Sequence, residues 1–167
     1  MSEEREQERE QERERAGGGG QLSAAARRER LQELAAALGE RAVSEGERLI
    51  LESGGAVALY VTVEPDGAFR LTWWQTATAP DGHPRWREAA ATLTQPGEAI
   101  YTSALGGGFL VELERRATSV DEARRLANEP TPVERVAALA AAFPEALGQL
   151  PPEPVPAYLL PPEPEEP

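Results

Sequence analysis

The feature that most restricts the fold is a run of alternating apolar residues on each side of a Pro-Asp-Gly turn. Between residues 57 and 63 every second side chain is a large aliphatic one, and the alternation resumes between residues 69 and 73. Side chains alternate between the two faces of a strand, so the pattern predicts an antiparallel hairpin with one buried face. Gly67 can take the positive φ that the turn at residues 65–67 requires.

Two further segments have strand character. Residues 49–52 are predicted to form a short strand, and residues 98–105 and 109–114 a second hairpin around Gly106–Gly108. Residues 85–93 fit either a short helix or a strand. The three alanines at 89–91 favour the helix.

Helical patterns lie at both ends of this strand-rich region. Beginning at Ser23, apolar residues recur with helical spacing, and Gly46 is the predicted end of that helix. The members of the stripe are Leu31, Leu34, Ala35, Leu38 and Ala42. Ser119–Glu122 and Thr131–Glu134 both have the form of a capping box, the second with Pro132 at the first helical position. Pro144 is predicted to kink or restart the last helix.

These elements predict a two-layer α+β domain, with an antiparallel sheet of about five strands packed against an N-terminal helix and C-terminal helices. With residues 85–93 helical, the order is helix, three strands, helix, two strands, helix. That order resembles the secretion-chaperone-like proteins, including the YbjN-like group. The resemblance covers the whole domain and rests on element order, without a shared motif.

Both ends of the chain differ in composition from its middle. Residues 1–16 are almost entirely Glu, Arg and Gln and precede four glycines, whereas residues 151–167 are rich in Pro and Glu. Such segments have too little apolar surface to offset the conformational entropy lost on ordering. The sequence therefore predicts a disordered charged tail and Gly linker over 1–21, one domain over 22–150, and a disordered acidic tail over 151–167.

The charge balance excludes several classes of partner. The formal net charge is −12, which repels the phosphates of nucleic acids and of anionic membranes. The sequence also contains no signal-peptide pattern and no apolar run long enough to span a bilayer. We therefore expect neither nucleic-acid nor membrane binding, and a cytoplasmic location.

Few residues are suited to catalysis. The chain has no Cys, and its one histidine, His83, lies in a predicted turn, so neither a metal site nor a cofactor is expected. Four glutamates fall on predicted strands: Glu52, Glu64, Glu112 and Glu114. They fit a paired-carboxylate active site, or simply a solvated strand face.

An aromatic cluster is the first candidate binding site. Trp73 and Trp74 are adjacent on a strand and must face opposite ways, so Trp74 shares a face with Tyr60 and Arg70. Exposed Trp, Tyr and Arg side chains are typical of protein-binding hot spots. Alternatively, a helix of the same domain covers this second face and Trp74 becomes a core residue.

The C-terminal tail contains the second candidate. Tyr158, Leu159 and Leu160 form an apolar island in an acidic, Pro-rich run, and polyproline geometry lowers the ordering cost of binding. The island is either a docking motif or a segment that folds back on its own domain.

The leading interpretation is a non-catalytic, cytoplasmic protein-interaction module, of the chaperone, adaptor or immunity type, which binds another protein. The alternative is a small-ligand-binding protein or an enzyme that uses Glu and Arg in a pocket between sheet and helices. A purely accessory protein is a third reading. A deep pocket with converging Glu, Arg and Tyr side chains favours the alternative, and a flat exposed aromatic face favours the module.

Overall fold

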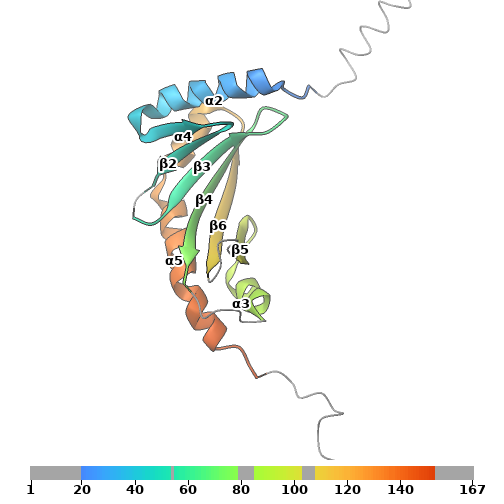
Figure 1. Ribbon diagram of the computed structural model, residues 1–167, viewed down its shortest axis with the longest axis vertical. Helices are drawn as coiled ribbons and strands as arrows, with labels where there is room; N and C mark the ends of the chain where they lie inside the picture. The colour runs from blue at the N-terminus through green and yellow to red at the C-terminus, as the bar shows by residue number, and fades with distance from the viewer. Residues whose placement is uncertain (1–19, 54, 79–84, 103–107, 153–167) are drawn as a thin grey trace, which may run out of the picture.

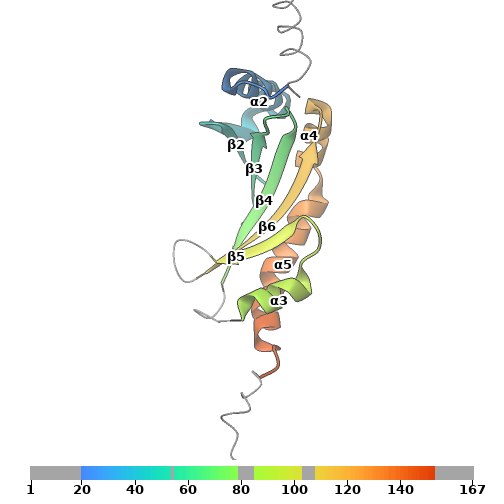
Figure 2. The ribbon, with the colours of Figure 1, turned by 90° about the vertical axis from the view of Figure 1, so that its right-hand side faces the viewer.

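A computed structural model of the chain describes residues 20–53, 55–78, 85–102 and 108–152. It has an α+β fold, in which helices pack on one face of an antiparallel sheet, as the sequence predicts (Figures 1 and 2). The predictions for most of both tails and for His83 lie outside these residues. No helix in the described part of the chain has the length and apolar character needed to cross a bilayer.

The predicted first hairpin is formed by β3 (Ala58–Val63) and β4 (Phe69–Ala77), which pair in antiparallel register. At its turn, Gly67 has a φ of 87°. Its N–H donates to the Glu64 carbonyl at 2.9 Å, and Asp66 accepts from the Ala68 N–H at 3.0 Å. The turn residues therefore act as their types predict.

Within the described residues, the sheet has six strands in the order β1-β2-β3-β4-β6-β5. The remaining four strands are β1 (Ala42–Glu45), β2 (Arg48–Glu52), β5 (Glu98–Thr102) and β6 (Phe109–Ala117). The long strands β4 and β6 pair over nine residues. The predicted second hairpin is the β5–β6 pair at one edge.

The sixth strand corrects the prediction of about five strands and a first helix that continues to Gly46. Helix α2 (Ala24–Leu38) ends at Gly39, whose φ is 73°. A short 3₁₀ turn follows, and residues 42–45 pair with β2 across a turn at Gly46. Ala42 fits the spacing of the helical stripe by coincidence, because Gly39 ends the helix in a backbone conformation that favours glycine.

The other helices are α3 (Trp86–Leu93), α4 (Val120–Ala127) and α5 (Pro130–Gly148). Residues 86–93 are thus helical, as the alanines indicate. Ser119 caps α4, its hydroxyl accepting from the Glu122 N–H at 3.2 Å. Helix α5 begins at Pro130 rather than at the predicted Pro132, and it does not restart at Pro144, which lies inside it. Pro130 itself provides the fixed φ suited to a first helical turn.

All of these helices pack on the same face of the sheet, which we call the covered face (Figure 2). Trp73 is fully buried there together with Phe69 and Leu71 from the same strand. Phe143 of α5 meets Phe109 of β6 edge-on, with ring centroids 4.8 Å apart. The β3–β4 alternation thus places its large apolar side chains in the core.

One ion pair joins α5 to the edge of the sheet. The side chain of Glu98 in β5 is only 3% exposed. Its carboxylate accepts from Arg135 Nε at 2.7 Å and Nη2 at 2.9 Å, and from the Gln95 N–H at 2.8 Å. The hydrogen bonds from Arg135 are the main reason why the pKa of Glu98 lies below its ordinary value.

Candidate functional site

The opposite face of the sheet, which we call the open face, has no helix packed on it among the described residues (Figure 2). Apolar and aromatic side chains nevertheless cross it from β1 to β5. We define the open-face patch as Val43, Ile50, Tyr60, Trp74, Leu110 and Tyr101. Val43 is 62% exposed and Tyr101 is 49% exposed.

The centre of the patch is an aromatic pair. The rings of Tyr60 and Trp74 are stacked, with centroids 5.4 Å apart and planes inclined by 29°. The Arg48 guanidinium lies 4.7 Å from the Tyr60 ring centroid, and it also pairs with Glu45. Trp74 is half-buried by these strand neighbours and keeps part of its surface in solvent.

Arg70 lies on the same face as Tyr60 and Trp74, as expected from strand alternation, but it is part of a charged network. It pairs with Glu64 and lies 3.8 Å from Glu114. Arg116 donates to Glu64 at 2.9 Å and pairs with Asp66. Bonds from Arg116 first, and then from Arg70, lower the pKa of Glu64. The network borders the aromatic pair and fixes Arg70, so its guanidinium is less available to a partner than the sequence suggested.

Glu112 is the carboxylate closest to the aromatic pair in the strand register. It is opposite Trp74 on β4 and opposite Ala99 on β5. Partial burial raises its pKa, and the negative charge of Glu114 adds to this effect. Within the described part of the chain, no basic side chain pairs with Glu112.

A shallow depression of about 520 Å³ lies at the β1 end of the patch. Val43 and Ile50 line it, together with Glu40, Arg41 and Glu52. Ile50 is paired with Tyr60 across β2 and β3, so the depression continues the aromatic surface. The result is a broad, shallow surface of apolar side chains with carboxylates at its margins.

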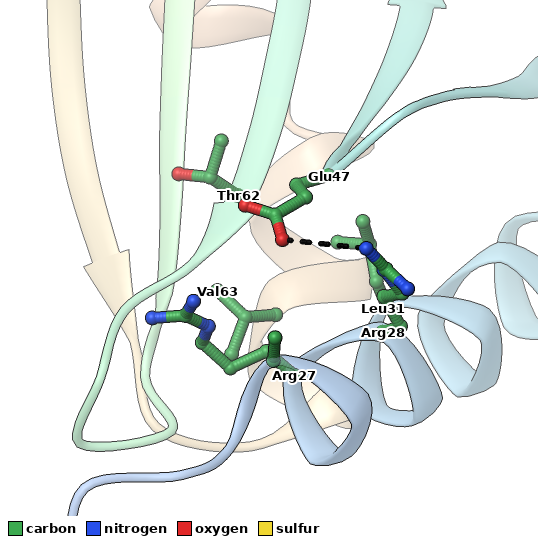
Figure 3. Close-up of a pocket in the computed structure, with 7 residues that line it drawn as sticks. Arg27, Arg28, Leu31, Glu47, Thr62 and Val63 are labelled. Atoms are coloured by element: carbon green, nitrogen blue, oxygen red, sulfur yellow. Dashed lines mark ion pairs between the residues drawn. The ribbon is translucent and has the colours of Figure 1, made fainter.

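A second, smaller hollow lies between α2 and β3 (Figure 3). Its volume is about 160 Å³, and its polar lining includes Arg27, Arg28, Glu47 and Thr62. Arg28 and Glu47 form an ion pair across it at 3.8 Å, with both side chains more than 60% exposed. No tyrosine lines this hollow, and it is smaller than typical small-molecule sites of about 300–1,000 Å³.

Sequence reasoning identified the centre of the patch and missed its extent. The predicted first helix, which ends at Gly46, includes Val43, although Gly39 and Gly46 on either side indicate a separate short element. Tyr101 falls in the predicted strand at residues 98–105, and the sequence does not indicate which face of the sheet its side chain is on. Glu112 was interpreted only as a catalytic or a solvated glutamate. The candidate residues Tyr158, Leu159 and Leu160 lie outside the described part of the chain.

Comparison with protein-family models and with curated proteins finds no match for this chain. The resemblance to secretion-chaperone-like proteins therefore stays a prediction, and the observed order has one more strand at its start. Among the described residues, no three Asp, Glu or His side chains gather as metal ligands would.

Proposed function

We propose that this chain is a non-catalytic protein-interaction module, of the chaperone, adaptor or immunity type, that holds another protein on its open face. The observation that supports the proposal most is the stacked Tyr60–Trp74 pair on a sheet face that no described helix covers. Large planar side chains lose little rotamer entropy when a partner covers them, so they are effective binding anchors.

The shape and composition of the open face also support a macromolecular partner. The patch extends across the sheet from Val43 on β1 to Tyr101 on β5, and both side chains are well exposed. Exposed contiguous apolar surface of this kind on a soluble domain typically marks an interaction site. The depression beside Ile50 is shallow, which suits a protein surface better than an enclosed small molecule.

For the alternative, a small-ligand-binding protein or enzyme, the hollow in Figure 3 is one candidate site among the described residues. Arg27, Arg28 and Glu47 provide the Arg and Glu side chains that this alternative requires. The small volume and the exposed ion pair give it less support than the open-face patch has. Binding of an anion that depends on Arg27 and Arg28 would favour this alternative.

The acidic C-terminal segment is a second proposed contact, through Tyr158, Leu159 and Leu160. We further propose a cytoplasmic protein that binds neither nucleic acid nor membranes, on the grounds of its net charge of −12. Salt-sensitive binding to DNA or RNA in an anisotropy assay would contradict this part of the proposal.

The test is affinity capture with the full chain, comparing wild type with Trp74→Ala. We expect proteins captured by the wild type to be lost with Trp74→Ala. Trp86→Phe is the control, because Trp86 packs against Phe109 on the covered side and a phenyl ring keeps most of that packing. Equal capture by wild type and Trp74→Ala, with both variants folded, would remove the open face as the binding site.

A further inference from the structure

The charges on and around the open face are unbalanced. Carboxylates outnumber the basic groups among the described residues there. The carboxylates are Glu40, Glu45, Glu52, Glu64, Asp66, Glu112 and Glu114, and the arginines are Arg41, Arg48, Arg70 and Arg116. Arg48, Arg70 and Arg116 each already have a carboxylate partner. Arg41 lies at the β1 end of the patch and donates to the Asn128 side chain, so none of these described cations pairs with Glu112.

The excess of negative charge destabilises the folded chain most at Glu112. Its carboxylate is partly removed from water, and Glu114 lies two residues away on the same face of β6. A charge withdrawn from solvent without a partner is destabilising. Its strand neighbours, Trp74 and Ala99, offer no charge.

The aromatic pair also favours a cation. Cations are attracted to the faces of aromatic rings, most strongly to tryptophan. Tyr60 already has the Arg48 guanidinium 4.7 Å from its ring centroid. Trp74 has no such neighbour among the described residues, although it is the better ring and is paired with Glu112 across β4 and β6.

We infer that the open-face patch binds a basic peptide segment of a partner protein, with an Arg or Lys side chain lying between Trp74 and the Glu112 carboxylate. This inference rests on the proposed function and specifies the chemistry of the partner. The cation compensates Glu112 and contacts the indole, while apolar residues of the segment cover Tyr60 and Ile50. Charge complementarity of this kind selects the partner as well as attracting it.

Other occupants of the patch are disfavoured by charge. A second copy of the chain also has a net charge of −12. Residues 153–167 of the chain itself contain four glutamates and no basic residue. Both would add negative charge to the surface that already lacks cations.

The experiment uses the full chain and a set of short synthetic peptides that each contain one Arg flanked by Leu and Ser. Matched sets have Gln or Glu in place of the Arg. Binding is followed by fluorescence anisotropy of labelled peptides. We expect the Arg set to contain the tightest binders, and Glu112→Gln to weaken them about 10-fold, the usual cost of losing one charged hydrogen bond. Glu134→Gln, an exposed position on α5, should leave binding unchanged.

The outcomes separate this inference from the proposed function. If peptides bind through Trp74 with no preference for Arg, or if Glu112→Gln has no effect, the basic-segment inference is wrong and the interaction face remains. If Trp74→Ala also has no effect, both are wrong. If Leu159→Ser/Leu160→Ser in the full chain strengthens binding of all three peptide sets alike, the chain's own tail occupies the patch and the inference is overturned.

Discussion

Glu98 and Glu112 lie on the neighbouring strands β5 and β6, yet their carboxyl groups face opposite sides of the sheet and have opposite pKa shifts. On the covered face, hydrogen bonds from Arg135 hold the pKa of Glu98 below its ordinary value. On the open face, burial raises the pKa of Glu112. Both side chains are withdrawn from water, so the difference lies in their partners.

This difference shows which face is complete within the domain. On the covered face, the buried carboxylate of Glu98 is satisfied by a guanidinium and a backbone N–H. On the open face, the partly buried carboxylate of Glu112 lies beside the aromatic pair and forms no ion pair with a basic side chain of the described residues. This is the arrangement expected if another molecule covers the second face of the sheet, as we propose.

Trp73→Ala tests whether the covered face is the core of the domain, and it has the largest expected effect on stability. Trp73→Ala should lower the free energy of unfolding by about 3–5 kcal/mol, because the side chain is fully buried and its loss leaves a cavity. Urea unfolding at equilibrium measures this cost. Leu34→Ala, in the same core, should cost about 2–5 kcal/mol. A cost below about 1 kcal/mol for either would mean that the covered face is not the core.

Glu98→Gln tests the compensated carboxylate. Removing one member of a buried ion pair costs about 3–5 kcal/mol, and we expect about 2 kcal/mol at neutral pH because solvent reaches part of Arg135. Since the pKa of Glu98 is lowered, its contribution is fully present above the ordinary glutamate pKa. It is lost as the pH falls through the lowered value.

The difference in stability between wild type and Glu98→Gln should therefore shrink on acidification. Urea unfolding at neutral pH and at about pH 3 measures it. A difference that is constant over this range would mean that the carboxylate charge of Glu98 does not contribute to stability.

The sequence predicted the covered face better than the open one. Alternation along residues 57–63 and 69–73 determines which side chains are buried, so the hairpin, its turn and the buried position of Trp73 follow from periodicity alone. The boundaries of α2 and α5 were wrong because a helical spacing that includes Ala42 and a capping pattern at Thr131 are weak signals. A positive φ at Gly39 and a proline at residue 130 overrode them.

The sequence predicts which residues of the candidate site share a face, but it does not predict how their charges are paired. That Tyr60, Arg70 and Trp74 share a face is a local property of paired strands. Whether Arg70 is already paired and Glu112 is not depends on contacts between β3, β4 and β6, which are distant in sequence. No residue type or spacing encodes that balance of charge.

Trp74→Ala sharpens the comparison from the open side. We expect a loss of about 1 kcal/mol, the order of an aromatic pair, because Trp74 is only half-buried and its main ring contact is Tyr60. When both variants are measured under the same conditions, the loss in free energy of unfolding should be severalfold larger for Trp73→Ala than for Trp74→Ala. Equal costs for Trp73→Ala and Trp74→Ala would show that both faces are core, and the open face would lose its role as a binding surface.

Glu112→Gln should change the free energy of unfolding least of all these variants. Whether it raises or lowers stability is the informative result. An acid whose pKa is raised on folding destabilises the folded chain as the pH rises through the interval between its unfolded and folded pKa values. Glutamine has no charge to desolvate, so the variant should be as stable as wild type at about pH 4 and slightly more stable at about pH 8. We expect a gain within the 0.5 kcal/mol or so that is usual outside a core.

Paired urea titrations of wild type and Glu112→Gln at the two pH values measure this gain. Glu114→Gln is the matched control, because the Glu114 carboxylate lies 3.8 Å from Arg70 and its loss removes a partner from that guanidinium. A loss of stability in Glu112→Gln at the higher pH would mean that the folded chain already supplies a cation to Glu112. The two glutamates would then be alike, and the open face would have no unpaired charge for a partner to neutralise. A gain would mean that the chain retains at this position a carboxylate that weakens the free domain, as expected where the charge serves binding rather than folding.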